Sequence, residues 1–150
     1  MTKKLKDFLQ TILQDQMATS KGTVEHNKLQ YVVVDDVVGD SGDESFCTKI
    51  RQRPDLKPYF VASAKTEAPI AGIINGEFVS CRIDRLLINH DNKSIVFIDY
   101  KTDKDKTRFI DEYKKQLEKY AILLHDAYPE YTITGYILWL AFDLELEKII

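Results

Sequence analysis

Asp99 and Lys101 end an apolar segment, SIVFIDYKT, whose composition is typical of a buried β-strand. Side chains alternate between the two faces of a strand, so these two charged residues should point to the same side. The alternation predicts one face made of Ile95, Phe97, Asp99 and Lys101, and another made of Val96, Ile98 and Tyr100. Burying a carboxylate or an ammonium group is costly unless it is paired or bound to a metal. Taken alone, the two residues fit either an ion pair at a strand end or part of a reactive site.

A second aspartate, Asp84, lies in VSCRIDRLLI, another mostly apolar segment that precedes the first by one turn. Two hairpin-linked strands would bring Asp84 and Asp99 to one spot. Two aspartates beside a lysine suit metal-assisted cleavage of a phosphodiester bond, because carboxylate oxygens hold Mg²⁺ and the metal offsets charge that develops on the phosphate. Lys101 would then position or deprotonate the attacking water.

The apolar pattern also predicts the elements that must hold these residues in place. Helical spacing predicts N-terminal helices over residues 3–18 and from Leu29 to Val37, followed by a surface loop or short helical turns over residues 39–58. The remaining prediction is strands over residues 59–64, 70–74, 78–88, 94–100, 132–142 and 145–149, with one helix over residues 109–127. Asn75-Gly76 is a hairpin signal between two of the strands. This order predicts an α/β sandwich with a mixed sheet.

Length and composition exclude several classes of protein. The 150 residues fit one domain with a net charge of -3. No apolar run approaches the roughly 20 residues of a membrane span, and the opening residues lack the apolar stretch of a secretory signal, so we expect a cytoplasmic protein with no membrane partner. Cys47 and Cys81 form no CxxC pair, which argues against a disulfide framework or a four-thiolate metal site. No phosphate-binding loop is present, so we expect no bound nucleotide.

Several motifs, taken in order along the chain, resemble those of the RecB-like and AddA-like nuclease domains of the PD-(D/E)XK superfamily, which usually end helicase–nuclease subunits. The matching segments are GTVEHNKLQ with His26, TEAPI with Glu67, GEFVSCRIDRL with Asp84, FIDYKT with Asp99 and Lys101, and YKKQLEKYAILL with Gln116 and Tyr120. The resemblance extends from about Gly22 to the final strands. The motifs are specific in this combination, whereas each one alone is weak.

The resemblance implies a restriction-endonuclease-like α/β fold, in which helices flank a mixed β-sheet and the N-terminal helices come first. It implies a single nuclease domain over residues 1–150, with residues 1–38 carrying the histidine and residues 59–150 forming the α/β core. By the same resemblance, Mg²⁺ (or Mn²⁺) would be the cofactor and Lys101 would serve the nucleophilic water. The implied metal ligands are His26, Asp84 and Asp99, and the implied supporting residues are Glu67, Gln116 and Tyr120.

The position of Gln116 on its predicted helix is informative even without the resemblance. It lies among Tyr113, Leu117 and Tyr120 on the apolar side of its predicted helix, where an amide needs a hydrogen-bonding partner. A phosphate, a sugar or the active-site network would supply one. The alternative is a glutamine at the edge of the helix that faces solvent.

The motifs lead us to expect a metal-dependent deoxyribonuclease of the exonuclease type, working with a helicase subunit or domain in DNA double-strand break repair. Its contacts should be mainly to phosphates rather than to bases. Three alternatives stay open: a catalytically inactive scaffold that binds DNA or braces a helicase complex, a protein-interaction module whose charges are only ion pairs, and an enzyme that acts on RNA or on branched DNA. The costly cluster of Asp84, Asp99 and Lys101 favours an enzyme.

Overall fold

The computed structural model describes residues 3–4, 24–25 and 27–150. The helical elements are α2 (Glu44–Arg51), the 3-10 turn η1 (Lys57–Tyr59), α3 (Ile110–Ala127) and the 3-10 turn η2 (Leu140–Phe142). The strands are β1 (Lys65–Ile74), β2 (Glu77–Asn89), β3 (Ser94–Lys101), β4 (Thr132–Trp139) and β5 (Glu145–Lys148). None of the helices in this part of the chain is both long enough and apolar enough to cross a lipid bilayer.

Within the described residues, the five strands form one mixed sheet in the order β1-β2-β3-β4-β5. Neighbouring strands are antiparallel except β3 and β4, which are parallel and are connected through α3. The turn between β1 and β2 is made by Asn75 and Gly76, with φ of 52° and 79°. Two successive positive φ values match the twist of a two-residue hairpin, which confirms the hairpin predicted from this dipeptide.

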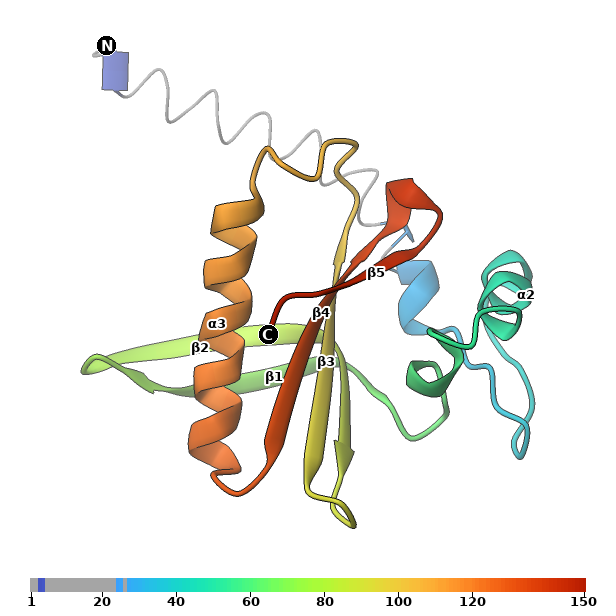
Figure 1. Ribbon diagram of the computed structural model, residues 1–150, viewed down its shortest axis with the longest axis horizontal. Helices are drawn as coiled ribbons and strands as arrows, with labels where there is room; N and C mark the ends of the chain where they lie inside the picture. Colours follow the sequence, from blue (N-terminus) through green and yellow to red (C-terminus); the bar gives the residue numbers. More distant parts are fainter. Residues whose placement is uncertain (1–2, 5–23, 26) are drawn as a thin grey trace.

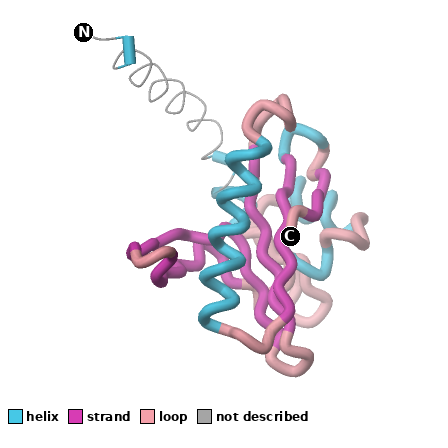
Figure 2. The backbone as a smooth tube through the Cα atoms, turned by 60° about the vertical axis from the view of Figure 1, so that its left-hand side comes forward, coloured by secondary structure: helices cyan, strands magenta, loops and turns pink. Residues whose placement is uncertain are grey.

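The sheet is covered on both faces (Figures 1 and 2). On one face α3 packs through Leu117, Tyr120 and Leu124 against a cluster that includes Phe97. On the other face, the chain that precedes β1, including α2 and η1, packs on a cluster that contains Ile98, Tyr100 and Leu138. The two faces predicted for β3 are therefore confirmed, and the α/β prediction with a mixed sheet and flanking helices is correct.

Two predicted elements are wrong. Helix is present at residues 27–30, but it does not continue to Val37: Val33 forms a β-bridge with Ser41, and Val37 is 92% exposed. The three successive β-branched valines, Val32–Val34, disfavour a helix. The apolar side chains of Val32 and Val34 instead pack an irregular segment onto the core. Residues 59–64 form no strand, because Pro58 lies in a 3-10 turn that places Phe60 in the core instead. The helix predicted over residues 3–18 lies almost entirely outside the described residues.

The segment predicted as a loop or short helical turns contains a true helix, α2. Asp43 caps its N-terminus by accepting a hydrogen bond from the Phe46 amide at 3.0 Å. Cys47 and Ile50 of α2 are buried in the cluster that contains Ile98, Tyr100 and Leu138. Apolar contacts thus hold a helix of only two turns in place, which is too short to be stable alone.

The hairpin of β1 and β2 departs from regular strand geometry at one level. Figure 1 shows it running crosswise to β3 and β4 and projecting past α3. Glu67 on β1 has a left-handed φ of 49°. In a regular strand, residues an odd number of positions apart face opposite sides of the sheet. Ile83 and Leu86 on β2 are three positions apart, yet both pack in the cluster on the α3 side, so the regular alternation of side chains is interrupted between them. The hairpin therefore bends at the level of Glu67 and Asp84.

Candidate active site

Asp84 and Asp99 lie opposite each other on neighbouring strands. The paired residues of β2 and β3 end with Arg85 and Ile98, and the next position of the same register brings the two aspartates together. Asp84 Oδ2 accepts a hydrogen bond of 2.7 Å from the backbone N–H of Tyr100, the residue that follows Asp99. The hairpin-linked strands thus place two carboxyl groups at one point, as the apolar pattern predicts.

The Asp84 carboxyl has an unusual electrostatic environment. Burial raises its pKa to about 8, and the negative charge of Asp99 and a hydrogen bond with that residue add to the rise, whereas the N–H of Tyr100 opposes it. Asp99 itself is only 4% exposed. Two carboxyl groups this close cannot both be charged at low cost unless a cation lies between or beside them.

Lys101 is the cation nearest to this pair among the described residues. Its Nζ lies 2.8 Å from Asp99 Oδ2 and 2.9 Å from Gln116 Oε1. The same ammonium lies 4.1 Å from the ring centre of Tyr113. Lys101 is therefore fixed by three different groups instead of extending into solvent, and the face shared with Asp99 is the one that the strand alternation predicts.

Gln116 and Tyr120 continue this arrangement along α3. Gln116 Nε2 donates to Tyr120 Oη at 2.8 Å, so one amide links the lysine to the tyrosine. The two residues are four positions apart and occupy the same side of the helix, with Tyr120 against Phe97 at a ring-centre distance of 5.9 Å. The expectation that Gln116 is partnered, rather than facing solvent, is correct: its partners are Lys101 and Tyr120.

Glu67 approaches the same spot from β1. It lies between the paired positions Thr66–Arg85 and Ala68–Ile83, which puts it opposite Asp84 in the hairpin. Its negative charge contributes to the raised pKa of Asp84. A left-handed φ at a residue with a side chain is strained, and such strain is common beside functional groups.

The donor set around the aspartates suits a hard divalent cation. Mg²⁺ is usually held by one or two carboxylates, with water and substrate phosphates completing its octahedral shell. In the part of the chain that the structure describes, no three His, Cys, Asp or Glu side chains converge in a metal-binding group. The aspartate pair provides two carboxylates for a cation, and burial together with the charge of Asp99 raises the pKa of Asp84, which a bound cation would oppose. His26, the third ligand implied by the sequence resemblance, lies outside the described residues.

This geometry can be compared with known proteins. A family model described as the PD-(D/E)XK nuclease superfamily matches residues 3–145. The chain belongs to the PD-(D/E)XK nuclease superfamily. A nuclease is therefore the general class of its activity, and nucleic acid is the class of its substrate. The five-stranded sheet and its flanking helices agree with the restriction-endonuclease-like fold of this superfamily. A search of curated proteins found no match.

PD-(D/E)XK nucleases typically use divalent metals. Arg85, Tyr100 and Tyr113 also lie in the region of the aspartate pair and were not predicted as site residues from the sequence. Two of them left a visible signal: Arg85 is a charge inside an apolar strand, and Tyr113 lies three residues before Gln116 on the same helix face. Tyr100 was visible only as an apolar strand residue, because its contribution to Asp84 is made by its backbone.

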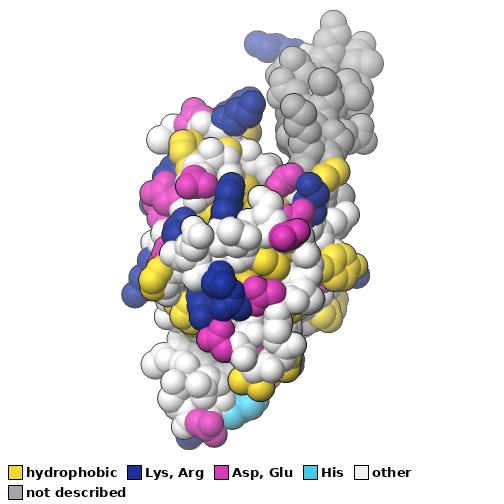
Figure 3. Space-filling view, turned by 90° about the vertical axis from the view of Figure 1, so that its right-hand side faces the viewer, with side chains coloured by type: hydrophobic (Ala, Val, Ile, Leu, Met, Phe, Trp, Pro, Cys, Tyr) yellow, Lys and Arg dark blue, Asp and Glu magenta, His cyan; other side chains and the backbone are white. Residues whose placement is uncertain are grey.

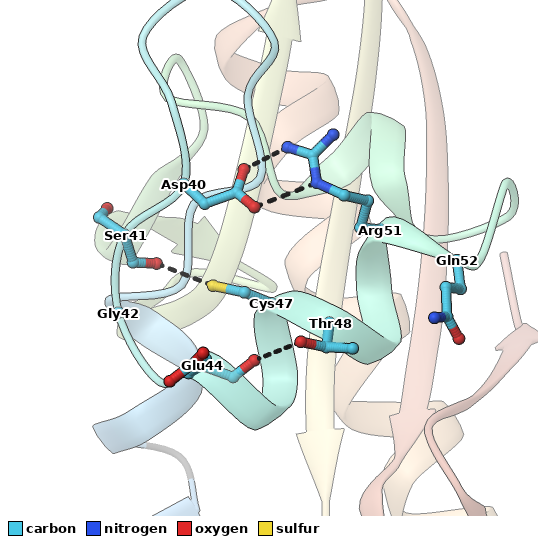
Figure 4. A pocket seen from close by; sticks show the side chains of 8 residues that line it. All are labelled: Asp40, Ser41, Gly42, Glu44, Cys47, Thr48, Arg51 and Gln52. Atoms are coloured by element: carbon cyan, nitrogen blue, oxygen red, sulfur yellow. Dashed lines mark hydrogen bonds and ion pairs between the residues drawn. The ribbon is translucent and has the colours of Figure 1, made fainter.

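A pocket of about 390 Å³ lies apart from these residues (Figure 4). It is lined by Asp40, Ser41, Gly42, Glu44, Cys47, Thr48, Arg51 and Gln52. Arg51 pairs there with Asp40, and Cys47 Sγ donates to Ser41 O at 3.1 Å. Acidic and basic side chains are interspersed on the molecular face that carries α2 (Figure 3). These internal pairings give the pocket a structural explanation.

Proposed function

We propose that this PD-(D/E)XK domain is a Mg²⁺-dependent (or Mn²⁺-dependent) deoxyribonuclease of the RecB-like and AddA-like type. The observation that carries the proposal is the contact of the buried Asp99 with Lys101, beside the carboxyl of Asp84. At the ends of adjoining strands, two carboxylates could hold a divalent cation and an ammonium could contact the attacking water, and hydrolysis of a phosphodiester needs both. Burial makes each of them costly without a ligand.

The residues have distinct proposed roles. Asp84 and Asp99 would hold the divalent cation, with His26 as a third ligand. A cation held there would offset the charge that develops on the scissile phosphate. Lys101 would orient the attacking water as an ammonium, or would accept the proton of that water once the lysine has lost its own proton and is a neutral amine.

The supporting residues would act through the lysine and the aspartates. Gln116 accepts from Lys101 and donates to Tyr120, so this helix would keep the ammonium directed at the water. Glu67 would orient a cation ligand from the opposite strand of the hairpin.

We further propose that residues 1–150 form one nuclease domain, in which residues 1–38 supply the histidine and residues 59–150 supply the core. The support is the order of the motifs around His26, Glu67, Asp84, Asp99 and Gln116. The same resemblance supports an exonuclease that a helicase subunit or domain feeds with DNA during double-strand break repair in the cytoplasm. Phosphate contacts would dominate, so cleavage should depend strongly on salt and little on sequence.

The test is cleavage of end-labelled linear DNA, single-stranded and double-stranded, with Mg²⁺, Mn²⁺ or EDTA. We expect metal-dependent cleavage by the native chain and at least about a 100-fold loss of rate in Asp99→Ala and Lys101→Ala. Lys93→Ala is the matched control, because Lys93 lies immediately before β3, at the end opposite Lys101, in an exposed ion pair with Glu130.

The two outcomes are distinct. Loss of cleavage in the two site variants, with normal activity in Lys93→Ala, would support the deoxyribonuclease. DNA binding without cleavage, unaffected by either site substitution, would instead favour a catalytically inactive scaffold. Preferential cleavage of RNA or of branched DNA in the same assay would retain the site and replace the proposed substrate.

A further inference from the structure

Arg85 is a buried cation that the proposed chemistry does not use. It is 1% exposed, and its guanidinium carbon lies 4.1 Å from the ring centre of Phe60. Its Nη2 donates to Leu29 O at 2.9 Å and to Val32 O at 3.4 Å, and its Nη1 donates to Tyr59 O at 3.2 Å. These carbonyls belong to the layer that precedes β1, so Arg85 fastens that layer to the strand carrying Asp84.

The fourth bond of Arg85 leads toward the aspartates. Its Nε donates to Tyr100 Oη at 2.8 Å. In the part of the chain that the structure describes, no aspartate or glutamate forms an ion pair with Arg85. A buried guanidinium without a carboxylate is costly, and an apolar side chain of similar length would avoid that cost. Packing alone therefore does not explain why an arginine is present here. The hydrogen bonds that it makes to the preceding layer and to Tyr100 do explain it.

Tyr100 connects β2 to β3 beyond their last paired position. The pairing of the two strands ends at Arg85 and Ile98. Two positions beyond Ile98, Tyr100 makes two bonds to β2: its backbone N–H donates to Asp84 Oδ2, and its hydroxyl accepts from Arg85 Nε. The hairpin bends away at this level, so these bonds join the strands where regular pairing has stopped.

We propose that Arg85 and Tyr100 form a clasp that sets the distance between the two carboxylate-bearing strands and so positions Asp84 and Asp99 for one cation. Both are positioning residues, because they act through Asp84 and need not touch the substrate. The inference rests on the proposed function, since it assigns the clasp to the same metal site.

Tyr100→Phe is the decisive variant, because it removes only the hydroxyl that accepts from Arg85 and keeps the buried ring. If the clasp sets the strand spacing, the amide of residue 100 should exchange with solvent at least about tenfold faster in the metal-free protein. The dissociation constant for Mn²⁺, measured by titration calorimetry on the full chain, should rise about tenfold. The kcat for DNA cleavage should fall by a similar factor with little change in KM.

Arg53→Met is the matched control. Arg53 also joins two segments through backbone carbonyls, donating to Asp143 O at 3.0 Å and to Leu144 O at 3.1 Å. Arg53→Met should lower the melting temperature at least as much as Tyr100→Phe does. It should leave the Mn²⁺ affinity and the amide exchange at residue 100 unchanged. Arg85→Met should show the same changes as Tyr100→Phe in larger measure. If Arg85→Met fails to fold, Tyr100→Phe still decides the question.

The outcomes separate the clasp from the proposed function. Native exchange at residue 100 and native Mn²⁺ affinity in Tyr100→Phe would overturn the inference, and so would equal losses of Mn²⁺ affinity in Tyr100→Phe and Arg53→Met. If the unaltered chain neither binds Mn²⁺ nor cleaves nucleic acid, the proposed function fails. Faster exchange confined to the clasp variants would then still support the clasp, and unchanged exchange would overturn it.

Discussion

Lys101 Nζ lies 2.8 Å from Oδ2 of Asp99, the residue two positions earlier on the same strand. Their side chains are 16% and 5% exposed, so the pair is largely removed from water. In a shielded pair each charge depends on the other, and removing one leaves an uncompensated ion. The contact therefore links stability to the proposed chemistry, because a bound cation would compensate the same aspartate.

The first prediction concerns the stability of Lys101→Met without metal. We expect its free energy of unfolding to fall by about 2–3 kcal/mol in EDTA, because Asp99 loses its partner inside the protein. Saturating Mn²⁺ should restore part of that loss by binding the aspartates. Urea unfolding with EDTA and with Mn²⁺ provides the measurement. The control Lys93→Met breaks an exposed pair and should change stability by less than about 1 kcal/mol. Equal effects of the two substitutions would contradict the prediction.

The second prediction is a pH dependence that comes from Asp84. Its pKa is raised from an ordinary 3.8 to about 8 in the folded protein. The folded state therefore binds the proton more tightly, so this contribution to stability is fully present below pH 3.8 and is lost as the pH rises to about 8. Asp84→Asn keeps the shape but cannot lose the proton. In EDTA, the free energy of unfolding of Asp84→Asn minus that of the native chain should be about 2 kcal/mol larger at pH 9 than at pH 5.

Urea unfolding of both proteins at the two pH values tests this expectation. Metal should remove the difference at high pH, because a divalent cation favours the charged carboxyl groups that a proton would otherwise neutralise. A stability difference between the native chain and Asp84→Asn that stays constant from pH 5 to pH 9 would show that Asp84 titrates normally.

The third prediction concerns the amide link between Lys101 and α3. Gln116→Leu removes the acceptor 2.9 Å from Lys101 Nζ, so kcat for cleavage should fall about tenfold. Tyr120→Phe keeps that acceptor and should lower kcat less, by about threefold. Steady-state kinetics on linear DNA distinguish them. Glu118→Leu, an exposed change on the same helix, is the control and should leave kcat unchanged. A larger loss in Tyr120→Phe than in Gln116→Leu would reverse the assigned order.

The fourth prediction concerns the strained backbone of Glu67. A left-handed φ of 49° is disfavoured for residues with a Cβ, so Glu67→Gly should be more stable than Glu67→Ala by about 1 kcal/mol. At Glu77, which is on β2 and is not among the residues with positive φ, the order should be the opposite, with alanine more stable than glycine. Chemical unfolding of the four variants is the measurement. The same order at both positions would mean that Glu67 is not held in the left-handed region.

Much of the candidate site follows from local sequence. Asp99 and Lys101 share a face because strand side chains alternate, and Asn75-Gly76 determines a tight hairpin because both residues adopt positive φ easily. The approach of Asp84 to Asp99 then depends only on two adjoining strands. These features involve residues close in the chain or joined by one turn, so the pattern of residue types is sufficient to predict them.

Tertiary structure decided the features that rest on distant contacts. The same valine-rich pattern suits a helix or an irregular packed segment, and residues 31–38 take the second form because Val32 and Val34 pack in the core while Val33 bridges to Ser41. Arg85 looks like an ordinary strand charge in the sequence, yet it finds carbonyl acceptors more than 50 positions away at Leu29 and Val32. A buried guanidinium is tolerated only where such acceptors converge, and their convergence is set by how the layers pack on the sheet and not by any neighbouring residue.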